Sequence, residues 1–269
     1  MGTDEDRVRT GRWVYDSGIL NCEARRALKA LAVPLSLLLL LMFGSAAVAS
    51  ADTFIIGKSV KYRPIEVRRF GDPGANFRAL IVGSVHGNEP QGIRMIRRLN
   101  RMARPGLKRV DLWTISTINP DGIARGTRKN ARGVDLNRNF PYRFDPDLDD
   151  GYNSGPGPLS EPESRAVLRL VRNRKFDLSI WYHQPWGRTL IPCNATARFA
   201  RRYSRMSGLG ARPGCDRPVR GSATDWMFHR FGTKAFVVEF AAGRLHAPVV
   251  KRHARAALRL MKGMRPGPS

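Results

Sequence analysis

Apolar and polar residues follow two different periods along residues 52–269. Four short apolar runs rich in β-branched residues predict buried strands, and they cover residues 79–85, 110–118, 178–182 and 235–238. After Pro90, by contrast, apolar residues recur every three positions, so that Ile93 and Ile96 share one face with Arg residues opposite. This spacing is typical of an amphipathic helix. The pattern therefore predicts strands that alternate with helices.

Three further segments carry helix signals. Ser160-Glu161-Pro162-Glu163 has the spacing of a capping box, in which the first and fourth side chains bind each other's backbone amides. Ser222-Ala223-Thr224-Asp225 looks like another helix start, and residues 248–261 form a basic amphipathic pattern. Apolar strands that alternate with helices are typical of a sheet covered on both faces. The expected fold class is α/β: a single domain with a mixed, largely parallel, twisted β-sheet and helices on both faces.

A long segment without periodicity, residues 119–158, separates the second predicted strand from the capping box. It is rich in Gly, Asn, Asp, Pro and Arg. Loops of this length inside a compact domain are uncommon, and they are usually functional. The segment is therefore a candidate source of functional residues.

The first 51 residues carry the signs of an export signal. An uncharged apolar stretch, residues 30–49, follows the cations Arg25, Arg26 and Lys29 and ends in small residues. This order predicts a secretory signal cleaved near Ala49 or Ala51. The alternative is an uncleaved membrane anchor, because the stretch approaches the ~20 residues of a spanning helix. Residues 1–51 are thus an extension with a signal peptide or anchor, and residues 52–269 are a secreted, extracytoplasmic domain.

Three cysteines bear on the compartment. Cys22 would be removed with the signal, which leaves Cys193 and Cys215 in the mature chain. Export makes disulfides possible, and an even pair in an oxidising compartment predicts a Cys193–Cys215 disulfide. Two unpaired thiols are the alternative.

The chain is strongly basic. Its 47 Lys and Arg residues against 22 Asp and Glu residues give a net charge of +25, and the excess arginine is scattered along the chain. Such a charge favours acidic partners, including an anionic cell envelope. We expect no nucleic-acid partner, because no zinc finger, basic zipper or aromatic RNA-binding box accompanies the charge.

Ionisable residues follow the predicted strands at the point where each one ends. His86 and Glu89 come after the first strand, His183 after the third, and Glu239 after the fourth. Sites in open α/β sheets form beyond the carboxyl ends of the strands. Two histidines and one carboxylate are a catalytic zinc set, and a carboxylate outside the metal shell can serve as general base. Spacing alone does not assign these roles, because H-x-x-E pairs are common.

The aperiodic segment carries two motifs that favour a zinc site over a chance H-x-x-E pair. They are Asn119-Pro120-Asp121-Gly122 and the string GVDLNRNFP at residues 133–141. With His86-x-x-Glu89, His183 after an apolar strand and Glu239 in FVVEF, the chain resembles the zinc carboxypeptidase family. Asp225-Trp226 also precedes Glu239 by the interval of that family. The matching pieces span residues 86–239, which is most of the mature chain.

The resemblance implies a role for each matching residue. One Zn²⁺ would be bound by His86, Glu89 and His183. Asp135 would accept a hydrogen bond from His86 and so hold its tautomer. Glu239 would be the general base. Arg128 would stabilise the oxyanion, and the terminal carboxylate of the substrate would be held by Asn137 and Arg138.

Two positions leave questions open. Arg125 competes with Arg128 as the oxyanion residue when the residues alone are considered. The digestive members of the family carry a mobile tyrosine twenty-two positions before the catalytic glutamate, where this chain has Arg217 beside Pro218. We therefore expect either that the substrate is bound differently or that Arg217 supplies the contact that the tyrosine makes in those enzymes.

The strings HGNEPQG and GTRKNARGVDLNRNFP look most like the bacterial murein peptide amidase branch of this family. That branch cuts between γ-linked D-glutamate and diaminopimelate in cell-wall peptides. The resemblance implies an exported zinc metallocarboxypeptidase or amidase that acts next to a free terminal carboxylate, with peptidoglycan stem peptides as candidate substrates. The alternatives are an N-acyl amino acid deacylase of the aspartoacylase and succinylglutamate desuccinylase type, which shares the HGNE and DLNR strings, and a non-catalytic wall-binding module.

Overall fold

The computed structural model describes residues 51–103, 107–148, 151–214 and 219–264. These residues belong to one compact unit, Val48–Ser269. Residues 1–50, which hold the predicted signal or anchor, lie outside the described residues, and so do Cys215 and Arg217. Cys193 is disulfide-bonded, and its pairing with Cys215 stays a prediction. In the part of the chain that is described, no helix is long and apolar enough to cross a membrane.

The four predicted strands form the centre of one eight-stranded sheet, ordered β1-β2-β4-β3-β5-β8-β6-β7. They are β3 (Arg78–Val82), β4 (Asp111–Ile115), β5 (Leu178–His183) and β8 (Lys234–Ala241). All neighbouring pairs among them are parallel. Their carboxyl ends consequently meet at one rim, as the predicted fold class requires. Two predicted strands are longer than the observed ones, because residues beyond Val82 and Ile115 leave the ladder to form the rim.

Four further strands, which the pattern did not predict, complete the two edges of the sheet. They are β1 (Asp52–Lys58), β2 (Pro64–Gly71), β6 (Trp186–Ile191) and β7 (Gly210–Pro213). At one edge β2 pairs antiparallel with β4, and β1 pairs antiparallel with β2, while β6 pairs antiparallel with β8 at the other side. They escape an apolar-run criterion because most of their residues are partly or fully exposed. The sheet is therefore mixed, with a parallel centre.

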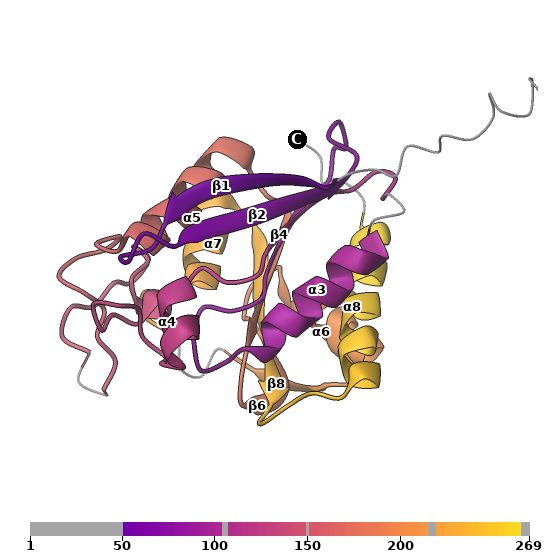
Figure 1. Ribbon diagram of the computed structural model, residues 1–269. Helices are drawn as coiled ribbons and strands as arrows, with labels where there is room; N and C mark the ends of the chain where they lie inside the picture. The colour runs from indigo at the N-terminus through magenta and orange to yellow at the C-terminus, as the bar shows by residue number, and fades with distance from the viewer. Residues whose placement is uncertain (1–50, 104–106, 149–150, 215–218, 265–269) are drawn as a thin grey trace, which may run out of the picture. The chain divides into compact units, whose positions relative to one another are not determined.

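Helices cover both faces of the sheet (Figure 1). Alternating residues of β3 show this directly, since Ala79 and Ile81 enter one core and Leu80 and Val82 the other. The first core is covered by α3 (Gln91–Ala103), α6 (Ala197–Ser207) and α8 (Ala247–Lys262). The second is covered by α5 (Pro162–Arg174) and α7 (Ala223–Phe231). The α/β prediction with helices on both faces is confirmed.

The two predicted helix starts have different outcomes. Ser222 is the N-cap of α7, and its hydroxyl accepts a hydrogen bond from the Asp225 backbone amide. The capping box at Ser160 is wrong. The predicted helix does form, as α5, but its N-cap is Glu161 without a side-chain cap. The Ser160 hydroxyl accepts from the Asn139 side chain at 2.9 Å and donates to the Glu161 carboxylate at 3.0 Å. Pro162 then begins the helix, where its missing amide costs nothing.

The aperiodic segment contains two short helical pieces. In α4 (Pro120–Arg125) the N-cap Asn119 accepts from the Gly122 amide at 2.8 Å. In the single 3₁₀ turn η1 (Leu136–Arg138) the N-cap is Asp135, which accepts from the Asn137 amide at 2.9 Å. Both motifs of the segment are therefore helix N-termini. The segment is ordered by side-chain caps and not by an apolar period, which explains why periodicity does not reveal it.

Candidate metal centre and active site

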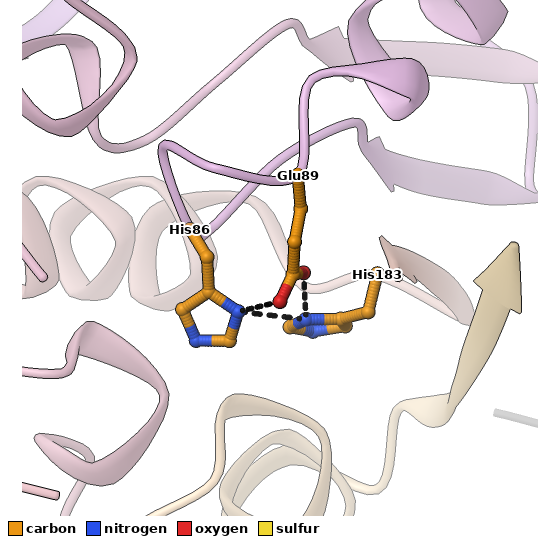
Figure 2. A group of neighbouring side chains, drawn as sticks. All are labelled: His86, Glu89 and His183. Carbon is orange, nitrogen blue, oxygen red and sulfur yellow. Dashed lines mark hydrogen bonds and ion pairs between the residues drawn. The ribbon is translucent and has the colours of Figure 1, made fainter. Parts of the chain in front are cut away.

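The ionisable residues predicted to converge do so at the carboxyl ends of the parallel strands. His86 and Glu89 lie between β3 and α3, and His183 is the last residue of β5. Glu239 is paired in register with His183 on the neighbouring strand β8. All four side chains are buried and line one cavity of about 240 Å³. Figure 2 shows His86, Glu89 and His183 pointing toward one another.

The geometry of this cluster fits a tetrahedral metal ion. His86 Nδ1 lies 3.2 Å from His183 Nδ1 and 2.8 Å from Glu89 Oε1, and Glu89 Oε2 lies 3.0 Å from His183 Nδ1. Ligand atoms about 2.0 Å from a tetrahedral zinc lie roughly 3.3 Å from one another. Nitrogen and carboxylate ligands are those that zinc takes in catalytic sites. In the described part of the chain these three residues form the group able to hold a metal.

Backbone packing brings the His86–Glu89 loop against the Asn119–Gly122 tetrapeptide. A methyl group added at Gly87, between the two ligands His86 and Glu89, would lie 1.9 Å from the carbonyl carbon of Gly122 in α4. The chain can therefore pass this close only with glycine at residue 87. The Asn119–Gly122 tetrapeptide thus acts as the platform against which the metal loop packs.

Asp135 lies behind His86, as the resemblance implied. Its Oδ1 is 3.0 Å from His86 Nε2, which leaves His86 Nδ1 for the metal. Burial alone would raise the pKa of Asp135 and of Glu89, but hydrogen bonds from the histidines hold both pKa values well below their ordinary range. Burial alone would lower the pKa of His86, whereas its bonds to Asp135 and Glu89 raise it. The centre is therefore built to keep its carboxylates ionised.

Glu239 has the environment of a general base. Burial raises the pKa of its carboxyl, and the nearby Glu89 carboxylate contributes to the same direction. Its Oε2 is buried and has no hydrogen-bond partner among the residues that are described. A carboxylate whose pKa is raised by burial is a better proton acceptor, because its ionised form is less well solvated than in water.

The arginines of the long segment separate into different tasks. Arg128 lines the cavity, donating to Glu89 Oε1 at 3.1 Å and to Asp135 Oδ2 at 2.9 Å. Arg125 instead donates to the Asn130 carbonyl and is not part of the cavity lining. Of these two arginines, Arg128 and not Arg125 therefore lies at the cavity.

Asn137 and Arg138 also line the cavity. The Asn137 side-chain oxygen accepts from the Ala223 amide at the start of α7, so its amide nitrogen is the group available to a substrate. The Arg138 guanidinium lies 4.2 Å from the centre of the Tyr152 ring. A methyl group added at Gly221 would lie 2.0 Å from the Arg138 carbonyl oxygen, so this glycine sets the position of Arg138.

Several cavity residues were missed by the sequence patterns. Tyr152 stacks on Arg138 from the aperiodic segment, where no period marks it. The backbone N–H of Gln184 donates to Glu89 Oε2 at 3.2 Å, and the position of Gln184 directly after His183 was the available signal. Trp186 lines the cavity while 58% of its side chain is exposed. Asp225 lines it too, and burial raises the pKa of its carboxyl.

Comparison with known proteins agrees with this geometry. Residues 49–213 match the family described as zinc carboxypeptidase. Carboxypeptidase SOL1 of Arabidopsis thaliana is 32% identical over 182 residues, which cover 56% of this chain and 36% of that protein. Murein peptide amidase A of Escherichia coli (strain K12) is 33% identical over 119 residues, covering 39% of this chain and 48% of that protein. The chain therefore spans between about a third and a half of these relatives.

Solved structures share the fold. The murein-tripeptide amidase of Escherichia coli O157 superposes with a TM-score of 0.62 and 23% identity, over 79% of this chain and 92% of that one. Carboxypeptidase A of Helicoverpa armigera gives a TM-score of 0.69 and 16% identity, over 80% and 69%. Because the family match covers more than half of the sequence and includes the residues His86, Glu89 and His183, the chain belongs to the zinc carboxypeptidase family.

Proposed function

We propose that this protein is a zinc-dependent carboxypeptidase or amidase that hydrolyses the peptide or isopeptide bond next to a free terminal carboxylate. The observation that carries the proposal is one cavity lined by the His86–Glu89–His183 cluster, the unpaired base Glu239 and two arginines. Zinc, when bound there, would polarise the scissile carbonyl and lower the pKa of a bound water.

The protein's own residues supply the remaining chemistry. Glu239 accepts a proton from the attacking water and then delivers it to the leaving amine. The Arg128 guanidinium, already oriented by Glu89 and Asp135, offers a cation to the oxygen that becomes negative. The substrate carboxylate is held by the Arg138 guanidinium and the Asn137 amide, a charge-assisted pairing. Tyr152, stacked on Arg138, limits the rotation of that guanidinium.

Asp225 supports a narrower substrate class. A partly buried carboxylate in a cavity that also holds Arg138 favours a terminal residue that carries an ammonium group as well as a carboxylate. Diaminopimelate, the terminal residue of certain peptidoglycan stem peptides, has both groups. The relative named murein peptide amidase A is consistent with this choice. We therefore include murein stem peptides among the proposed substrates.

Export to the cell envelope is part of the proposal. Its support is the order of cations, apolar stretch and small residues within residues 1–51, together with the strongly basic composition. Peptidoglycan and other acidic polymers lie outside the cytoplasmic membrane, where such a protein would meet them. When the full-length sequence is expressed, detection of the protein in the extracytoplasmic fraction with an N-terminus near Asp52 would agree with a cleaved signal. Retention in the cytoplasm would contradict export.

The direct test compares three substrate groups with the zinc-loaded protein. These are γ-D-glutamyl-diaminopimelate peptides, ordinary peptides with free C-termini, and N-acetyl or N-succinyl amino acids. We expect hydrolysis of the first group above the second, and none of the third. Preference for the N-acyl amino acids would instead identify a deacylase.

The variant Glu239→Gln separates catalysis from binding. It should keep its zinc content, measured by mass spectrometry, and lose about 10²- to 10⁴-fold in kcat, because it removes the base and no metal ligand. Full activity of this variant would contradict the role of Glu239. Zinc-loaded wild-type protein that hydrolyses no substrate would favour a non-catalytic binding module.

A further inference from the structure

A second concave surface lies outside the active site, between α3 and α8, which run side by side in Figure 1. This groove has a volume of about 840 Å³. From α3 it receives Arg94, Arg97, Arg98 and Arg101. From α8 it receives Lys251, Arg252, Arg255 and Arg259. Its other lining residues are small or apolar, and the lining contains no acidic and no aromatic side chain.

The cations of the groove are not neutralised by the protein. Neither α3 nor α8 contains an Asp or a Glu. Within the described ranges, no carboxylate lies within ion-pair distance of any of the eight cations. Only Arg94 among them makes a side-chain hydrogen bond there. Arg98 Nε is even buried without a partner. Solvated helix faces ordinarily mix both signs of charge, so this surface is unusual.

The cations form one stripe along α3 and another along α8. Arg94 and Arg98 are one helical turn apart on α3, as are Arg97 and Arg101. On α8, Lys251, Arg255 and Arg259 follow the same interval. One turn rises about 5.4 Å, so each stripe presents charges at regular steps along the groove. Like charges at this interval repel each other and destabilise a helix. A bound anion with repeated charges would remove that repulsion.

The groove begins beside the active site. Helix α3 starts two residues after the metal ligand Glu89, and α8 follows β8, which carries Glu239. Arg94 donates to the Leu245 carbonyl at 2.7 Å, and the Gln91 side chain accepts from the Leu245 amide at 3.0 Å. The backbone N–H of Gln91 in turn donates to the side-chain oxygen of Gln184 in the cavity lining, at 3.3 Å. The Arg94 end of the groove is thus joined to the rim, and the Arg101 end is remote from it.

We propose that the α3–α8 groove binds one flexible, linear polymer with regularly spaced phosphates and no aromatic bases, and holds it next to the active-site rim. A concave surface with cations from two helices suits a single extended chain better than a flat bilayer. Nucleic-acid single strands are ordinarily held by aromatic stacking in addition to charge, and the groove offers no aromatic side chain. The proposal stands on this surface and is independent of the reaction catalysed.

The test measures binding of inorganic polyphosphate over a series of salt concentrations. The variant Arg97→Glu/Arg255→Glu changes one exposed arginine on each wall of the groove. Its matched control, Arg68→Glu/Arg172→Glu, makes the same change of net charge at exposed arginines on β2 and α5. We expect the groove variant to bind about tenfold more weakly or worse, with the slope of log Kd against log salt smaller by roughly 1.5. The control should change far less.

Further measurements keep the result interpretable. Thermal unfolding checks that each variant is folded, and Arg97→Gln/Arg255→Gln, which adds no acidic group, should show an intermediate loss of binding. Hydrolysis of a short peptide should be unchanged in every variant, because none of these residues lines the active-site cavity. Equal losses in the groove variant and its control would overturn the proposal. Tighter binding of a single-stranded oligonucleotide with the same number of phosphates, or a groove effect seen with anionic phospholipid vesicles alone, would overturn it too.

Discussion

At the scale of single residues, the choice between the arginines of the long segment depends on a few polar contacts. Arg125, Arg128 and Arg138 are close in sequence and chemically identical. Arg128 donates to two carboxylates at the metal centre, whereas Arg125 donates to the Asn130 carbonyl. Arg138 lies over Tyr152 in the cavity. The position of each guanidinium, and not its identity, therefore decides what it can bind.

Arg138→Ala tests the carboxylate grip. We expect KM for a substrate with a free terminal carboxylate to rise about 10- to 100-fold, because a charge-assisted hydrogen bond is worth about 1.5–3 kcal/mol. KM for the amidated form of the same substrate should hardly change. Arg125→Ala is the matched control, and it should leave both substrates unaffected. Steady-state kinetics of the four combinations measure this, and equal losses on both substrates would assign Arg138 another role.

At the scale of elements, the metal centre depends on how closely the loop after β3 approaches α4. Gly87 and Gly122 lie in two different motifs. Gly87 is needed because the Gly122 backbone passes next to it, whereas a side chain at residue 122 would meet the Asn119 side chain that caps α4. Caps supply the rest of the local order, with Asn119 and Asp135 each satisfying the first amides of a short helical piece. Asp135 thereby both starts a turn and orients His86.

Gly87→Ala should disturb this packing. The added methyl group would overlap the Gly122 carbonyl, so we expect a loss of about 1–3 kcal/mol in the free energy of unfolding. Zinc affinity should fall as well, because His86 and Glu89 flank the substitution. Gly157→Ala is the control, since a methyl group there meets nothing within 4 Å. Urea denaturation and zinc titration of both variants measure the effects. Unchanged zinc affinity in Gly87→Ala would contradict the platform role of α4.

At the scale of the whole molecule, the two helix layers contribute differently. The layer with α3, α6 and α8 contains a buried polar chain, in which the Tyr182 hydroxyl lies 3.0 Å from that of Tyr203, and Tyr203 lies 2.8 Å from His253 Nδ1. Burial, together with the charge of Arg252, lowers the pKa of His253 to about 4. This layer therefore carries a pH-dependent part of the stability.

The sign of that dependence follows from proton binding. Between the unfolded pKa of 6.5 and the folded pKa of about 4, the unfolded chain binds a proton at His253 and the folded protein does not. The contribution of His253 to the free energy of unfolding is therefore complete above pH 6.5 and is lost as pH falls toward 4. It amounts to about 3 kcal/mol. Urea denaturation at pH 7 and pH 4.5 should show a smaller drop in His253→Gln than in the wild type. Identical drops would show that His253 is not responsible.

The four central strands, helix α3 and the metal ligands were predictable because each leaves a local mark. Buried parallel strands are continuous apolar runs, and the ligands follow the strands directly. The edge strands left no such mark, since β1, β6 and β7 are mostly exposed. The capping box was wrong at Ser160, because its hydroxyl accepts a hydrogen bond from the Asn139 side chain and not from a helix amide.

The sequence by itself determined the fold class and the identity of the residues in the metal centre, because strand periods, helix caps and family motifs are local features. Only the tertiary structure decided which of the arginines faces the cavity, that Asp225 and Tyr152 belong to it, and that the cations of α3 and α8 line one groove. These facts join residues far apart in the chain. They arise from the parallel sheet, which brings the ends of β3, β5 and β8 to one rim and sets α3 beside α8.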